Sequence, residues 1–285
     1  MLLVRLPIVL SLLTLASPVA AQSFEPFGQT SPDHLRRYTE CMSLARKEPL
    51  RALPMAQKWA GEGGGLGARH CVAIAMYEAG RLADAAAQFE SIAADVDADR
   101  PGLRAELYAQ AGQAWLGAGQ TAKAATAQSR ALALKSDDAD LWIDRALTYA
   151  TTGEWPRAVS DFDHALALRK DNVEILVLRS AAWRSAGDIA QSMADAQRAL
   201  KIAPDNTDAL LERGFTLLAR GDTKPAESDF NKVLQLVPPD SEAANRAKIG
   251  LEGGQAMSSK LAPIAPSPPA QTGQKKGGQS GGKNQ

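Results

Sequence analysis

The sequence has little of the material from which most enzyme sites are made. Its 285 residues include two cysteines and three histidines, and aromatic residues make up only 5% of the chain. His34, His70 and His164 lie far apart, so the chain has no i, i+4 histidine pair and no metal-ligand spacing with cysteine. Basic and acidic residues both total 32, and a net charge of zero gives no general reason to bind nucleic acid. We therefore expect no metal, no cofactor, no small-molecule substrate and no nucleic-acid partner.

Long apolar runs are also missing, apart from a short one at the N-terminus. Arg5 precedes an apolar run over residues 8–16, and Val-Ala-Ala at 19–21 stands before Gln22. This pattern predicts a signal peptide over residues 1–21, cleaved ahead of Gln22. The run is shorter than the roughly 20 residues that span a bilayer, although an uncleaved anchor is the alternative. We expect a periplasmic or secreted protein whose residues 22–32 form an N-terminal arm.

What the sequence does have is a repeat of 34 residues. The segments 105–138, 139–172, 173–206 and 207–240 follow one another without a gap. Counted from each start, small residues recur at positions 8, 20 and 27, large residues at 4 and 11, and glycine at 15. Small side chains let helices approach closely, and glycine adopts a positive φ in a turn at no steric cost. Each segment therefore predicts two short helices, helix A and helix B, which are stable only when stacked on neighbours.

The pattern resembles the tetratricopeptide repeat. The segment 139–172 carries it most completely, with Trp142, Ala146, Tyr149, Gly153, Trp155, Ala158, Phe162 and Ala165. Two segments end in proline as the family does, at Pro204 and Pro238, whereas Lys170 stands at that place in the segment before them. The resemblance implies an all-α fold, a right-handed superhelical solenoid of stacked helix-turn-helix hairpins, and a binding scaffold rather than an enzyme.

The repeat extends less regularly toward both ends of the chain. Residues 66–99 continue it, and residues 33–66 form a degenerate first unit in which Pro49 and Pro54 depart from the pattern. Residues 240–251 predict a final capping helix, so that the solenoid covers residues 33–252.

Composition changes after the predicted solenoid. Residues 253–285 are rich in proline, glycine, glutamine and lysine and contain no acidic residue. Such composition predicts a disordered basic tail. It also leaves an alternative function open, in which the tail contacts anionic lipid or cell-wall polymer and the protein has a structural or assembly role at the cell envelope.

In this family, helix A lines the inner groove. The resemblance implies a partner-binding groove made by Tyr77, Ile143, Leu147, Val177, Arg184, Leu211, Phe215 and Leu218. An acidic row at position 2 borders it, comprising Glu106, Asp140, Glu174 and Asp208. An apolar groove with an acidic edge favours a protein or peptide with basic residues, and the large apolar residues Tyr77, Leu147 and Phe215 are the expected anchors. Two alternatives stay open: the acidic row could stabilise helix N-termini, and neighbouring repeats or the tail could bury the apolar stripe.

A charged pair also follows the repeat. Position 7 holds Arg145, Arg179 and Arg213, and position 23 holds Asp161, Asp195 and Asp229. Units without this arginine lack the aspartate as well, since Ala111 goes with Ala127. Joint presence and absence favours structural ion pairs between helices A and B, with an anion-binding stripe of arginines as the alternative.

The two cysteines align on the first helices of adjacent units. Cys41 is at position 9 of the first unit and Cys71 at position 6 of the second. Facing helices can bring such positions within disulfide reach. We predict a disulfide, with two buried free thiols as the alternative.

Three short patterns that suggest catalysis or nucleotide binding do not fit their surroundings. Residues 278–282 have the spacing of a nucleophile elbow, and residues 277–283 nearly form a phosphate-binding loop, but both lie in the predicted tail. Residues 63–68 resemble a dinucleotide fingerprint but follow a helix rather than a strand. We read all three as linkers or flexible loops.

Overall fold

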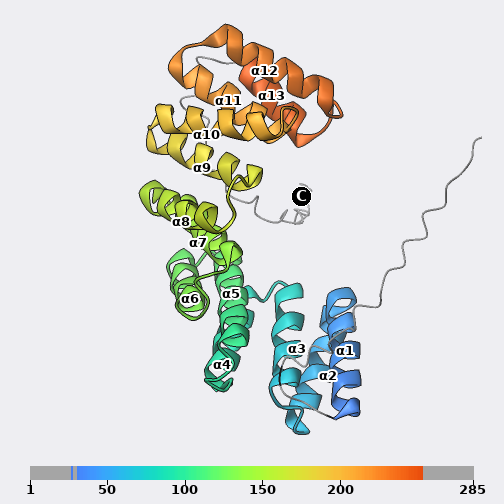
Figure 1. Ribbon diagram of the computed structural model, residues 1–285. Coiled ribbons are helices and arrows are strands. Elements are labelled where there is room, and N and C mark those ends of the chain that lie inside the picture. The colour runs from blue at the N-terminus through green and yellow to red at the C-terminus, as the bar shows by residue number, and fades with distance from the viewer. Residues whose placement is uncertain (1–26, 28–30, 253–285) are drawn as a thin grey trace, which may run out of the picture. The chain divides into compact units, whose positions relative to one another are not determined.

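The computed structural model describes residue 27 and residues 31–252, and in this part of the chain all regular structure is helical. The helices are α1 (Pro32–Lys47), α2 (Pro49–Gly61), α3 (Gly65–Glu78), α4 (Leu82–Asp95), α5 (Pro101–Gly117), α6 (Thr121–Leu134), α7 (Ala139–Thr151), α8 (Trp155–Leu168), α9 (Val173–Ala186), α10 (Ile189–Ile202), α11 (Thr207–Arg220), α12 (Thr223–Leu236) and α13 (Glu242–Glu252). The expected all-α fold of successive helical hairpins is confirmed (Figure 1). None of these described helices is long and apolar enough to cross a membrane.

The helices form two compact units, residues 1–103 and 104–285. In the first, α3 packs against α1, α2 and α4, and a small core gathers around Ala45, Ala56 and Cys71. Pro49 begins α2, where its missing N–H costs nothing, and Pro54 lies inside the same helix.

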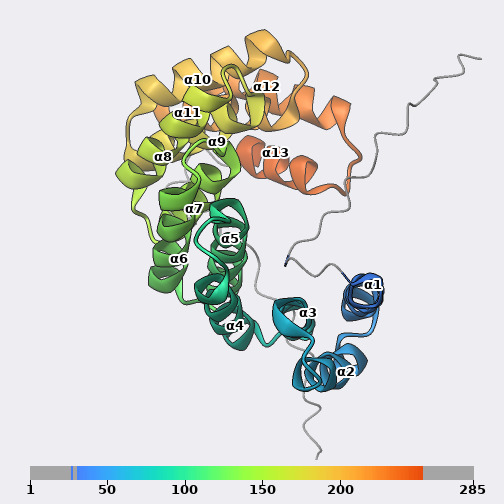
Figure 2. The ribbon, with the colours of Figure 1, turned by 60° about the horizontal axis from the view of Figure 1, so that its bottom comes forward.

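In the second unit, each helix from α6 to α13 packs against the next one along the chain. The helix-A members α9 and α11 also pack on each other, as do α11 and α13 (Figure 2). Phe162, Leu176, Leu210 and Phe230 belong to one continuous apolar core that these hairpins share. Stacking is therefore what buries the apolar face of each short helix.

The turns and caps have the residues that their geometry requires. The glycines at position 15, including Gly153 and Gly187, have φ of 74° and 89° between helix A and helix B. Asn172 and Asn206 accept hydrogen bonds from the backbone N–H groups of Ile175 and Ala209, which caps α9 and α11. These local signals fix where each hairpin begins and turns.

Close contacts explain the small residues at position 8. In Gly214, a Cβ atom would lie 2.6 Å from the ring of Phe230. Ser180 is fully buried and donates to the backbone oxygen of Ser192 at 2.9 Å. At position 8, helix B therefore packs too closely on helix A for a large side chain.

Candidate functional site

The residues of the predicted groove are divided between the two units. Tyr77 lies on α3 of the first unit with 36% of its surface exposed, and the other seven lie on helix-A members of the second. Leu147 on α7 is 37% exposed, whereas Ile143, Val177 and Leu218 are half-buried.

Leu211, Phe215 and Arg184 need a correction as partner-contacting residues. Leu211 is 0% exposed and Phe215 only 4%. The centres of the Phe215 and Phe230 rings are 5.1 Å apart, and the guanidinium of Arg184 lies 5.6 Å from the centre of the Phe215 ring. Neighbouring helices cover these side chains, so the expected anchor Phe215 belongs to the core.

Beside Phe215 lies a buried ionic cluster. Glu212 is 1% exposed, and its carboxylate accepts from Arg184 of α9 at 2.9 Å and from Arg246 of α13 at 3.0 Å. Arg246 also reaches Asp208 at 3.4 Å. Nothing in the repeat pattern singles out Arg246, since its importance depends on α13 lying against α11.

On α7, the helix face that corresponds to Asp208, Glu212 and Phe215 of α11 is partly exposed to solvent. Asp140, Ile143, Asp144 and Leu147 are spaced i, i+3, i+4 and i+7, so they share one side of the helix, here called the α7 surface. Asp144 is half-buried and accepts a hydrogen bond from Gln113 at 3.2 Å. Burial raises the pKa of Asp144, the hydrogen bond from Gln113 lowers it in part, and the carboxylates of Asp140 and Asp138 raise it further. Among the described residues, no lysine or arginine forms an ion pair with Asp144.

The repeated arginines of position 7 lie between helices rather than on an open surface. Arg145, Arg179 and Arg213 each bind the aspartate 16 residues later with two guanidinium nitrogens, at 2.6–2.8 Å. The aspartates Asp161, Asp195 and Asp229 are buried. Burial and bidentate geometry both favour a structural role for these pairs.

Two of these arginines also reach the preceding hairpin. Arg145 donates to the hydroxyl of Ser129 on α6 at 2.9 Å, and Arg179 donates to Asp163 on α8 at 2.6 Å. Each therefore holds helix B of its own hairpin and helix B of the one before.

The two cysteines lie across the contact between α1 and α3. Cys41 and Cys71 are joined as a disulfide, with their Cα atoms 6.2 Å apart. Next to it, the hydroxyl of Tyr38 lies 2.9 Å from Nδ1 of the buried His70. Burial raises the pKa of Tyr38 to about 12, so its hydroxyl stays protonated. His70 and Cys71 are buried in the packing of the first unit, and Cys41 is partly buried.

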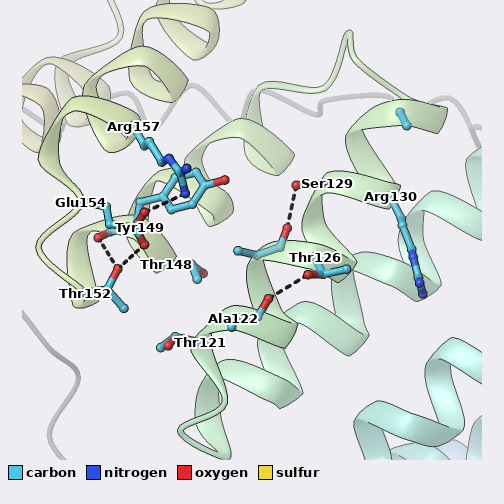
Figure 3. Close-up of a pocket in the computed structure, with 12 residues that line it drawn as sticks. Thr121, Ala122, Thr126, Ser129, Arg130, Thr148, Tyr149, Thr152, Glu154 and Arg157 are labelled. Atoms are coloured by element: carbon cyan, nitrogen blue, oxygen red, sulfur yellow. Dashed lines mark hydrogen bonds and ion pairs between the residues drawn. The ribbon is translucent and has the colours of Figure 1, made fainter.

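A hollow of about 660 Å³ lies between α6, the end of α7 and the start of α8. Figure 3 shows Tyr149 and Arg157 on one wall and Thr126 and Ser129 on the other. Arg157 is paired with Glu154 at 2.7 Å and lies over the Tyr149 ring. The walls are mostly methyl groups and one aromatic face, so the hollow suits an apolar side chain of a bound partner.

Comparison with known proteins identifies the repeat. Residues 111–183 match a family model described as tetratricopeptide repeat. Residues 111–183 therefore belong to tetratricopeptide repeats. A search of curated proteins gave no significant match.

Solved structures of tetratricopeptide-repeat proteins share the fold. The C-terminal part of a TPR repeat-containing protein from Cytophaga hutchinsonii aligns with a TM-score of 0.60 at 13% identity, over 75% of this chain and 93% of its own. MamA from Desulfovibrio magneticus RS-1 aligns with a TM-score of 0.53 at 17% identity, over 60% of this chain and 94% of its own. YrrB, described as a TPR protein with an unusual peptide-binding site, aligns with a TM-score of 0.51 at 16% identity, over 67% of this chain and 96% of its own. At these identities the similarity concerns the fold alone.

The repeat numbering offers a sequence signal for the hollow. At position 17 the two middle repeats carry Trp155 and Ile189, whereas Thr121 in α6 and Thr223 in α12 are smaller. At position 21 the later repeats carry Val159, Met193 and Glu227, and only α6 has a residue as small as Ala125. Small residues at both positions occur together in α6 alone among the four regular repeats, and this combination is the sequence signal that could have located the hollow.

The short patterns rejected above find no catalytic setting among the described residues. Residues 63–68 comprise the end of the turn between α2 and α3 and the first turn of α3, with Gly63 and Gly65 at φ of 88° and 59°, and no strand of the described chain adjoins them. The two patterns within residues 277–283 lie outside the described residues, as do the predicted signal peptide and tail. In the part of the chain that the structure describes, no group of three or more His, Cys, Asp or Glu side chains could hold a metal ion.

Proposed function

We propose that this protein is an exported scaffold that binds another protein or a peptide segment at the α7 surface. The fold supports a binding role, since tetratricopeptide-repeat arrays present helix faces to partners. Among proteins of the same fold, YrrB is described as having a peptide-binding site. Export is supported by the predicted signal peptide and by the disulfide, which persists in oxidising compartments.

The observation that carries the proposed site is the pairing of Leu147 with Asp144. A single exposed leucine is ordinary on a protein surface. Here, however, Leu147 lies beside a half-buried carboxylate that no cation of the described chain neutralises. A partner that covers Leu147 and brings a cation to Asp144 satisfies both side chains.

A catalytic role has little support. Both cysteines form the disulfide, and His70 is engaged with Tyr38. His164 is stacked on Trp142 with ring centres 4.2 Å apart, away from the cysteines in sequence. We therefore infer a non-enzymatic scaffold.

The test is capture of a partner by exported full-length protein, using chemical crosslinking in a periplasmic extract. Leu147→Ser should remove the partner that the unaltered protein captures. Leu168→Ser is the matched control, because Leu168 is a leucine 44% exposed at the end of the helix-B member α8. Equal capture by the two variants would contradict the α7 surface. If Ala125→Phe, which fills the hollow, then removed capture, the site would lie there.

Export needs its own measurement. We expect the mature protein in the periplasmic fraction or the medium, with an intact mass that begins at Gln22. A mass that retains residues 1–21 would instead show an anchored protein. The alternative envelope role of residues 253–285 predicts that deleting them abolishes envelope association while Leu147→Ser does not.

A further inference from the structure

We propose that the α7 surface receives an arginine side chain from its partner, with Asp144 as the carboxylate that binds the guanidinium and Leu147 as the apolar contact beneath it. This inference rests on the proposed function and names the chemistry of the partner. Its basis is a contact that the same chain already makes two repeats further along.

That contact is made by Arg246 of α13, whose side chain packs on α11. The guanidinium of Arg246 binds Glu212 at 3.0 Å and Asp208 at 3.4 Å, and it lies 5.9 Å from the centre of the Phe215 ring. An arginine from another helix is thus held by two carboxylates and one large apolar side chain. In the repeat numbering these three residues occupy positions 2, 6 and 9.

The same three positions on α7 carry the same chemistry. Two repeats of 34 residues earlier, they are Asp140, Asp144 and Leu147. The other two helix-A members of the regular repeats lack it. Positions 6 and 9 are Gln110 and Gln113 on α5, and Leu178 and Ala181 on α9. The combination of two acids and a large apolar residue therefore recurs at α7 and α11 alone among the four regular repeats.

The difference between α7 and α11 lies in what covers them. Glu212 receives guanidinium groups from Arg184 and Arg246. The residues two repeats before these arginines are Leu116 and Leu178, so the described chain offers Asp144 no guanidinium from either place. Asp144 has the neutral amide of Gln113 instead, at 3.2 Å.

Asp140 does not remove the need for a cation. Both oxygens of its carboxylate accept from Arg169 at 2.6 Å, and the two side chains are 66% and 44% exposed. Arg169 thus binds Asp140, while Asp144 keeps only the neutral amide of Gln113. The carboxylate of Asp140 still acts as negative charge near Asp144, whose pKa it raises.

Arginine fits this surface better than lysine. A guanidinium is planar, donates to two carboxylates at once, and packs its face on an apolar or aromatic side chain. Lysine offers a compact and strongly hydrated charge. The partner segment we expect carries one arginine with apolar neighbours that cover Leu147.

The test selects 12-residue random peptides displayed on phage against the full-length exported protein. We expect arginine to be enriched among peptides whose binding depends on Leu147. In a selected synthetic peptide, citrulline in place of the arginine removes the charge and keeps the shape. It should weaken binding about tenfold or more, as expected for a charge-assisted hydrogen bond.

The matched variants are Asp144→Asn and Glu174→Gln. Asp144→Asn keeps an oxygen that accepts from Gln113 but removes the charge. It should therefore also weaken binding of the arginine peptide about tenfold. It should leave the citrulline peptide unaffected, which isolates the pairwise contact. Glu174→Gln neutralises an exposed acid on α9 and should change binding less than twofold, within the typical error of additive sites.

Two outcomes would overturn the inference and are distinguishable. Peptides that need Leu147 but bind equally with arginine or citrulline would refute the arginine contact and leave the proposed function standing. Failure to select any peptide that depends on Leu147 would refute both the inference and the α7 surface.

Discussion

Replacing Arg179 by methionine tests the structural role of the position-7 arginines. Arg179 donates to Asp195 with two nitrogens at 2.8 and 2.7 Å, and to Asp163 with a third at 2.6 Å. The Asp195 side chain is 7% exposed and that of Arg179 is 19% exposed. Arg179→Met keeps an apolar stem in place but leaves the carboxylate of Asp195 buried without a cation.

The expected loss follows from that burial. Breaking a buried ion pair by removing one partner costs about 3–5 kcal/mol. Because part of Arg179 is in contact with water, we expect the lower end, about 3 kcal/mol, in the free energy of unfolding. For an array of this size each kcal/mol lowers the melting temperature by roughly 2–4 °C, so the expected shift is roughly 6–12 °C.

Thermal unfolding followed by far-ultraviolet circular dichroism measures the shift, with two control variants. Arg198→Met breaks the pair with Asp171, whose side chains are 48% and 61% exposed, and should cost about 1 kcal/mol or less. The double variant Arg179→Met, Asp195→Leu removes the stranded charge and should recover much of the loss. If Arg179→Met melted no earlier than Arg198→Met, the structural reading would be refuted. Lost partner binding at an unchanged melting temperature would instead favour an anion-binding stripe.

Three further predictions concern the two units. Replacing Cys41 and Cys71 by serine should destabilise the first unit by roughly 3–4 kcal/mol in the chain-entropy estimate for a 30-residue loop, visible as earlier hydrogen exchange there; free thiols that alkylate fully without reduction would contradict it. Gly214→Ala should cost about 1–3 kcal/mol in urea unfolding, since its Cβ would meet the Phe230 ring at 2.6 Å, and a neutral result would show that the ring can move. Because the pKa of Asp144 is raised above 3.8, protonation of Asp144 stabilises the fold below about pH 3.8, and this contribution is lost as pH rises through the folded-state pKa. Asp144→Asn should therefore unfold later than the unaltered protein at neutral pH and equally at low pH; a lower neutral stability would contradict the raised pKa.

Much of the fold follows from local rules that a sequence displays. Gly153 and Gly187 mark the turns, because a residue with positive φ is needed there. Asn172 and Asn206 mark helix starts through their capping oxygens. The separation of 16 residues between arginine and aspartate is fixed by the hairpin, so their joint occurrence indicates contact.

The candidate site was harder to predict, because accessibility depends on what stacks above each helix. The repeat numbering places Phe215 and Leu147 at the same position, but α13 and α9 flank α11 and bring Arg246 and Arg184 over Phe215. Leu147 stays partly exposed, at 37%. Position in the repeat gives the direction of a side chain, and only the neighbouring helices decide whether it meets solvent.

The position-7 arginines also affect how the second unit loses its structure. Arg145 and Arg179 each hold two successive hairpins, through Ser129 and Asp163 in the earlier one. In a linear array whose stability is a sum of unit and nearest-neighbour terms, such bonds belong to the neighbour terms. Strong neighbour terms make adjacent units exchange their amide hydrogens together. Residues 105–206 should therefore open as one block rather than hairpin by hairpin.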